Sequence, residues 1–228
     1  MRVKQLFNDG WQFTKRAIGT KLEDLSKDKI AWSDVDIPHD WLIYDTNHLY
    51  ETGEGWYHKK FTLSSEDLNN RRYDICFEGV YMNTTVYVNG AVAGEWKYGY
   101  STFTFDITKL LQAGENEIVV QVVHEAPNSR WYSGAGIYRN VWLIATSPSY
   151  LITDGIYIAP KKVDEEHWNV EIDTEVVLES GEEVGLVRQT ILNQDGQVVG
   201  MTEQEVRSLG EVRSLGSETN DALKISHN

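Results

Sequence analysis

Hydrophobic and polar residues alternate with a period of two along much of this chain. Residues 86–88 read Val-Tyr-Val and lead into Asn89-Gly90, a dipeptide that tolerates the positive φ angles of a two-residue hairpin turn. Residues 91–96 are then expected to form the returning strand. No window shows the apolar spacing of a long amphipathic helix, so the pattern predicts an all-β protein.

The segment after this hairpin predicts a strand that is buried on both faces. Phe103 and Phe105 flank Thr104, and residues 109–111 are expected to form a short helical or turn segment. Residues 118–123 read Ile-Val-Val-Gln-Val-Val, so most positions on both faces of an extended strand are apolar. Such a strand is typical of the middle of a β-sandwich.

The composition changes near Ser147-Pro148. Seven of the eight tryptophans precede this point. Of the 35 acidic and 21 basic residues, 16 and 6 lie after residue 150, so the rear part supplies −10 of the formal charge of −14. This shift predicts a boundary between two domains, 1–147 and 148–228.

The rear domain is expected to be incomplete. Residues 168–176 alternate between mostly apolar side chains and acidic or amide side chains, which predicts an antiparallel strand with one dry and one wet face. Asp195-Gly196 predicts a second hairpin turn. About four or five strands can be placed after residue 151, fewer than the roughly seven of an immunoglobulin-like sandwich. The polar tail, 217–228, is expected to be either a last strand or disordered.

The charge pattern argues against nucleic acid and membranes as partners. The net charge is −14 and no cluster of Lys or Arg is present, whereas a phosphate backbone is bound by clustered cationic side chains. No run approaches the roughly 20 apolar residues of a membrane span, and the N-terminus lacks the apolar stretch of a signal peptide. A cytoplasmic location is therefore expected.

Acidic, histidine and cysteine residues show no catalytic or metal-binding pattern. Glu51 lies close to Glu54, and Asp40 adjoins His39, so each could be half of an acid-base pair, but such proximity is expected by chance among 35 acidic residues. The six histidines are scattered, and no glycine-rich phosphate loop is present. Cys76, the single cysteine, is expected to be a semi-buried strand residue. We expect no catalytic residue, metal ion or cofactor in this chain.

Aromatic residues in turns are a more informative signal. Aromatic faces stack on the apolar faces of sugar rings, while nearby polar groups bind the hydroxyls. The alternative, which is expected for most of these residues, is that they fill or cover the core. The aromatic residues beside glycine or turn residues are Trp41, Trp56, Tyr57, Tyr98, Tyr100, Trp131 and Tyr132.

Four segments form a recognisable series. Residues 7–13 read Phe-Asn-Asp-Gly-Trp-Gln-Phe, residues 37–41 read Ile-Pro-His-Asp-Trp, and residues 55–61 read Gly-Trp-Tyr-His-Lys-Lys-Phe. The most specific segment is 129–143, Ser-Arg-Trp-Tyr-Ser-Gly-Ala-Gly-Ile-Tyr-Arg-Asn-Val-Trp-Leu. In this order they resemble the N-terminal region of glycoside hydrolase family 2, the β-galactosidase and β-glucuronidase family.

The resemblance implies a jelly-roll sugar-binding domain, similar to galactose-binding domains, over 1–147 and a partial immunoglobulin-like β-sandwich over 148–228. In the family a (β/α)8 barrel follows and holds both catalytic glutamates. The only Asn-Glu pair, Asn116-Glu117, is expected in a hairpin turn, so neither glutamate can be assigned here. The chain is therefore expected to be the non-catalytic front part of a retaining β-galactosidase-like enzyme, inactive alone, with a carbohydrate and the missing barrel as partners.

The resemblance also implies a set of substrate-binding residues. The family's loop before Gly136 reaches toward the active-site mouth, where some members place an aspartate against a substrate hydroxyl. Here Arg130 stands at about that position, and Arg139 is expected to anchor the loop. The candidate substrate-binding residues are His39, Asp40, Asn128, Arg130, Trp131 and Tyr132.

Two other functions remain open at this point. The aromatic turns would also suit a free-standing carbohydrate-binding module, and a complete second sandwich would suit an immunoglobulin-like interaction protein without sugar chemistry. The edges of an unfinished sandwich would also permit homo-oligomers, because unpaired strand edges accept further strands.

Overall fold

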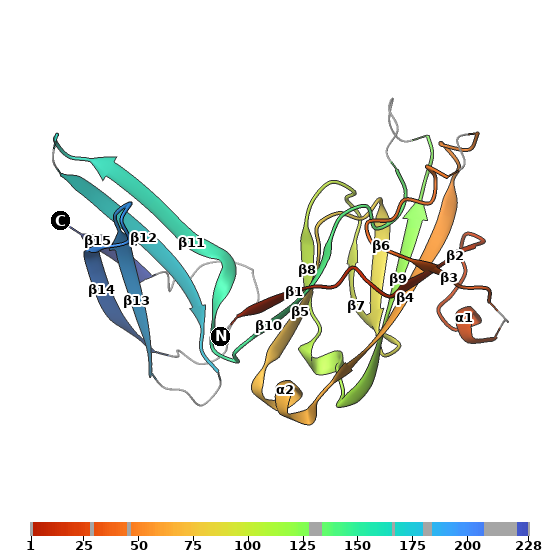
Figure 1. Cartoon of the computed structure of the whole chain (residues 1–228), viewed down its shortest axis with the longest axis horizontal. Helices are drawn as coiled ribbons and strands as arrows, with labels where there is room; N and C mark the ends of the chain where they lie inside the picture. The colour runs from red at the N-terminus through yellow and green to blue at the C-terminus, as the bar shows by residue number, and fades with distance from the viewer. Residues whose placement is uncertain are drawn as a thin grey trace. The chain divides into compact units, whose positions relative to one another are not determined.

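The structure of this protein is a computed structural model in which most residues lie in strands. It describes residues 2–27, 30–44, 47–127, 134–165, 167–179, 184–207 and 223–227. The chain divides into two units, residues 1–147 and residues 148–228 (Figure 1). All strand pairs in the described part of the chain are antiparallel, which confirms the predicted all-β class. No helix within these residues is long and apolar enough to cross a membrane.

The first unit contains two antiparallel sheets. The four-stranded sheet joins, in spatial order, β1 (Val3–Leu6), β10 (Val141–Thr146), β5 (Arg72–Phe77) and β8 (Phe103–Asp106). The six-stranded sheet joins, in spatial order, β3 (Ser33–Val35), β2 (Trp11–Arg16), β4 (Gly53–Leu63), β9 (Gly114–His124), β6 (Asn83–Val88) and β7 (Ala91–Trp96).

One hydrophobic core lies between these sheets. Ile75 and Phe77 of β5 and Val120 and Val122 of β9 have no exposed surface and belong to this core. Cys76 points to the opposite face of β5, where it is only 7% exposed and therefore more buried than predicted. The arrangement is the jelly-roll β-sandwich that the sequence predicts.

Strand β9 has the predicted central position. It pairs with β4 on one side and with β6 on the other. On the face away from the core, Val119 is only 7% exposed, but Glu117, Gln121 and Val123 are half-buried, so the prediction of burial on both faces holds only in part. The prediction for Asn116-Glu117 was wrong, because these residues lie inside β9, paired with Phe61 and Lys60 of β4, and not in a turn.

The predicted hairpin and short helical segment are also present. Asn89 and Gly90 connect β6 to β7 with φ angles of 49° and 83°, as a two-residue hairpin turn requires. A single 3-10 turn, η1 (Thr108–Leu110), follows β8. Two short helices, α1 (Asp24–Lys27) and α2 (Ser65–Asn70), were not predicted, because neither is long enough to show apolar periodicity.

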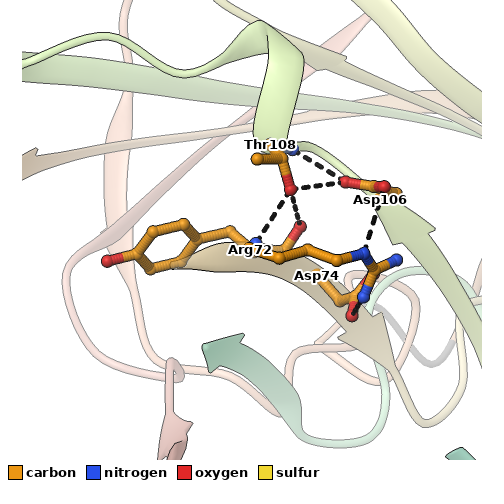
Figure 2. Close-up of polar contacts among 5 residues, drawn as sticks. Arg72, Asp74, Asp106 and Thr108 are labelled. Carbon is orange, nitrogen blue, oxygen red and sulfur yellow. Dashed lines mark hydrogen bonds and ion pairs between the residues drawn. The ribbon is translucent and has the colours of Figure 1, made fainter. Parts of the chain in front are cut away.

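A polar cluster fastens β8 and η1 to β5 (Figure 2). Arg72 forms ion pairs with Asp74 and, at 3.2 Å, with Asp106. Thr108 donates its backbone N–H and its hydroxyl to Asp106 Oδ1 at 2.9 and 2.6 Å, while its hydroxyl accepts the backbone N–H of Tyr73 at 2.9 Å. Burial raises the pKa of Asp74 despite the neighbouring Arg72 guanidinium. The cluster therefore connects β5, β8 and η1 on the side of the four-stranded sheet.

The second unit contains five strands in its described residues. One sheet joins, in spatial order, β11 (Tyr150–Lys162), β12 (Trp168–Val177) and β15 (Leu223–His227). The other pairs β13 (Val184–Leu192) with β14 (Val198–Arg207) through a turn at Asp195-Gly196, which confirms the second predicted hairpin. Of the two alternatives for the tail, its residues 223–227 form a strand. This is the partial immunoglobulin-like sandwich that the sequence predicts.

The second unit buries little. Thr174 is the one buried residue among those whose burial is described after residue 148, and its hydroxyl accepts a hydrogen bond from Gln189 Nε2 at 2.7 Å. The predicted dry face of β12 is wrong at Trp168, which is 57% exposed. Trp168 is the first residue of β12 and pairs with Lys162, the last residue of β11.

Candidate functional site

Three loop segments that are distant in the sequence meet at one end of the first unit. They are residues 37–44, 97–102 and 134–138, and we call them the loop rim. His39 N donates to Ile137 O at 2.8 Å and Trp41 N donates to Ala135 O at 3.0 Å. Tyr138 Oη donates to Gly99 O at 2.7 Å. The loop rim lies where β9 ends and β4 begins, at the upper end of this unit in Figure 1.

His39 is buried inside the loop rim. Its ring Nδ1 lies 2.8 Å from Tyr57 Oη, and only 8% of the residue is exposed. Burial lowers the pKa of His39, although the nearby Asp40 carboxylate acts in the opposite direction. The same burial raises the pKa of Tyr57 well above its usual value. His39 therefore presents little surface to a ligand, and its contact with substrate stays a prediction.

Asp40 joins residues 37–44 of the loop rim to residues 134–138. Its Oδ1 accepts the backbone N–H of Leu42 at 3.0 Å and that of Ala135 at 3.1 Å. A Cβ on Gly134 would lie 2.8 Å from Asp40 Oδ2. The other candidate substrate-binding residues, which all belong to segment 128–133, lie outside the described residues: Asn128, Arg130, Trp131 and Tyr132.

Gly136 occupies a position in the loop rim that only glycine fits. Its φ is +125°, and a Cβ there would lie 2.3 Å from Tyr57 Oη and 2.6 Å from His39 O. Its backbone N–H and C=O exchange hydrogen bonds with Tyr81 at 3.0 and 2.9 Å. Gly136 thus lets the chain after segment 128–133 pass directly over the buried Tyr57 hydroxyl.

The aromatic candidates divide into a buried and an exposed group. Tyr57 has no exposed surface and Trp41 is 8% exposed, and both belong to the core, which confirms the structural alternative for these two. Trp56 is also fully buried, but it lies outside the core cluster, where it donates to Glu54 and stacks near Tyr87. Tyr98 and Tyr100 are 58% and 48% exposed on the loop rim. Trp131 and Tyr132 lie outside the described residues.

The sequence reasoning missed Tyr44 as a further exposed aromatic residue. Tyr44 is 77% exposed, and its ring centroid lies 6.0 Å from that of His39. Its position three residues after Trp41, at the end of the Pro-His-Asp-Trp turn, was the signal that could have identified it.

The acidic candidates have structural partners. Glu51 forms an exposed ion pair with Lys15 at 2.6 Å. Glu54 is 1% exposed and accepts hydrogen bonds from Gly19 N at 2.8 Å, Trp56 Nε1 at 2.7 Å and Gln121 Nε2 at 3.1 Å. Within the described residues, no group of three or more His, Cys, Asp or Glu side chains could hold a metal ion. Both glutamates therefore make ion-pair or hydrogen-bond contacts within the first unit.

We expect His39 to make the first unit less stable in mild acid. Because the pKa of His39 is lowered in the folded state from 6.5, the unfolded chain binds the proton more readily. This contribution to stability is complete above the unfolded pKa and is lost as the pH falls through the lowered folded pKa. Thermal unfolding at about pH 7.5 and about pH 5, followed by tryptophan fluorescence, should show a smaller loss of Tm in His39→Asn than in the unmodified chain. An equal loss in both proteins would contradict this assignment.

Comparisons with known proteins agree with this architecture. The model of the sugar binding domain of glycosyl hydrolases family 2 matches residues 16–148. The β-galactosidase BoGH2A of Bacteroides ovatus is 37% identical over 225 residues, which cover 93% of this chain and 26% of that protein. A putative β-glucuronidase of Formosa agariphila is 31% identical over 222 residues, which cover 91% of this chain and 21% of that protein.

A solved structure matches over both units. The crystal structure of a putative β-galactosidase from Bacteroides fragilis is 29% identical, superimposes with a TM-score of 0.80, and covers 99% of this chain and 35% of that one. This chain therefore spans about a quarter of the length of the curated relatives it matches (26% and 21%). Since the family model matches more than half of the chain, this protein belongs to glycosyl hydrolases family 2.

Proposed function

We propose that this chain is the non-catalytic front part of a retaining β-galactosidase-like glycosidase, in which the loop rim forms one wall of the sugar pocket. The observation that carries the proposal is the 37% identity to a β-galactosidase over 93% of the chain. The loop rim supports it, because Asp40 and Gly136 fasten residues 134–138 to residues 37–44 and to Tyr57 of the jelly-roll sandwich. Functional residues commonly lie on loops that a rigid scaffold positions.

The acidic residues of the loop rim and its neighbourhood explain why bond cleavage is assigned to another part of the parent protein. Retaining hydrolysis needs two carboxyl groups about 5 to 5.5 Å apart across the scissile bond, one as acid-base and one as nucleophile. Asp40 accepts two backbone N–H groups, and Glu54 is enclosed by three donors. These hydrogen bonds hold both carboxylates in structural roles.

A direct test is to assay the purified chain with chromogenic β-D-galactopyranoside and β-D-glucuronide substrates. We expect no release of chromophore above that of an identical preparation from a host lacking both activities. The parent gene product should hydrolyse the galactoside with retention and in preference to the glucuronide. Clear turnover by the chain alone, or a parent protein inert toward β-galactosides, would refute the proposal.

A further inference from the structure

Two exposed tyrosines stand close together on the loop between β7 and β8. Tyr98 and Tyr100 are 58% and 48% exposed, and their ring centroids lie 5.8 Å apart with an interplanar angle of 70°. The ring of Tyr100 also contacts the ring of the buried Tyr81 at 5.2 Å. The pair therefore rests on the core at one side and faces solvent at the other.

The backbone that carries this pair is tightly held. Gly99 accepts the hydrogen bond of Tyr138 Oη at 2.7 Å, and a Cβ on Gly99 would lie 2.2 Å from the Tyr81 ring. On the far side of the pair, Thr102 Oγ1 donates to Glu78 O at 3.4 Å. The two rings thus keep a defined arrangement without a ligand, so a ligand that stacks on them loses little affinity to the ordering of this loop.

The surroundings of the pair combine apolar ring surface with polar groups. The phenol hydroxyls can donate and accept hydrogen bonds. The residue before the pair, Lys97, has 76% of its side chain exposed, and its Nζ lies 3.8 Å from Glu95 Oε2. A pyranose ring likewise combines an apolar C–H face with polar hydroxyl groups around its edge. An aliphatic peptide segment would match the rings but has no hydroxyl groups to offer to the phenols and to Lys97.

We propose that Tyr98 and Tyr100 form a saccharide platform, on which one pyranose ring stacks by its C–H face on the ring of Tyr98, while the ring of Tyr100, inclined at 70° to it, borders one side. The platform deepens the sugar-binding part of the proposed function and rests on it. It belongs to the loop rim, and it binds one sugar unit of a glycan. Its hydroxyl contacts come from the tyrosine phenols and Lys97.

Saturation-transfer NMR with methyl β-D-galactopyranoside and the whole chain tests the platform. We expect weak, saturable binding in the millimolar range, with the strongest transfer to the protons of the C–H face, H3, H4 and H5. D-mannitol, which has no ring face, should give no transfer. Tyr98→Ala should weaken binding by about five- to tenfold, the size of one lost aromatic contact, whereas Tyr98→Phe should keep it within about twofold because the ring remains.

Matched controls separate the platform from other causes. Tyr157→Ala removes a tyrosine that is 66% exposed in the second unit and should leave binding unchanged. Thermal unfolding of Tyr98→Ala should match that of the unmodified chain, since the side chain is mostly exposed. Galactoside binding that is indifferent to Tyr98→Ala and Tyr100→Ala would overturn the platform but leave sugar binding intact. Absence of any binding would also overturn the platform, while the proposed function would still be decided by the hydrolysis assays.

Discussion

Replacing Gly136 by alanine is expected to lower the free energy of unfolding of the first unit by about 4 kcal/mol, through backbone strain at positive φ together with steric overlap. The new Cβ would lie 2.3 Å from Tyr57 Oη and 2.6 Å from His39 O. Neither neighbour can move easily, because Tyr57 is fully buried and His39 O belongs to the backbone. Denaturant unfolding followed by tryptophan fluorescence measures the change, since seven of the eight tryptophans lie in this unit.

The matched control is Gly90→Ala in the turn between β6 and β7. Gly90 also has a positive φ, +83°, but nothing lies within 4 Å of a Cβ there. This variant should therefore show only the conformational penalty, about 1 kcal/mol. If Gly136→Ala were no more destabilising than Gly90→Ala, the close approach of the loop rim to Tyr57 would be wrong.

Replacing Glu54 by alanine is expected to destabilise the first unit by about 3 kcal/mol, because buried donors are left without partners. The carboxylate is 1% exposed and accepts hydrogen bonds from Gly19, Trp56 and Gln121. Its loss should also release the segment around Gly19 from the outer face of the six-stranded sheet. Chemical unfolding gives the energy, and amide hydrogen exchange at Gly19 reports the local release.

Two variants calibrate this result. Glu54→Gln keeps one acceptor oxygen but turns an NH2 group toward a donor, so it should cost about 1 to 2 kcal/mol. Glu51→Ala removes a nearby glutamate whose ion pair with Lys15 is exposed, and it should cost less than about 1 kcal/mol. An effect of Glu54→Ala as small as that of Glu51→Ala would show that Glu54 is solvated.

The elements that the sequence predicts correctly are those that local chemistry determines. Asn89-Gly90 forms its hairpin because the two residues themselves tolerate the positive φ angles of the turn. The two apolar faces of residues 118–123 reveal a central strand because each face must be covered by some other part of the fold. In both cases the information is contained within a few consecutive residues.

The features that were not predicted depend on parts of the chain that are distant in the sequence. Glu54 reads as a surface or catalytic carboxylate, but Gly19, 35 residues earlier, covers it and donates a hydrogen bond to it. The alternation in β12 predicts that Trp168 is a core residue, but its side chain is exposed. Its burial depends on which residues of the opposite sheet lie against that end of β12. Alternation identifies the two faces of a strand but not the segment that covers them.

The candidate site was also only partly predictable, because its contacts join segments that are distant in the sequence. The resemblance drew attention to His39 and Asp40, and the structure places both against residues 135–137, while their contact with substrate stays a prediction. Their burial and their hydrogen bonds to backbone groups come from the pairing of residues 37–41 with residues 135–137, which no local pattern encodes. The exposure of Tyr98 and Tyr100, in contrast to Tyr57, likewise depends on how their loop rests on Tyr81.

The uneven distribution of buried side chains between the two units has a practical consequence. Every buried hydrophobic side chain that the structure describes lies at or before Ala145, and the boundary between the units follows Ser147. A protease that cuts at this boundary would release a fragment that retains the entire described hydrophobic interior. Because residues after 150 carry −10 of the net charge of −14, the fragment 1–147 would also be far less acidic, so anion exchange would separate it from the uncut chain.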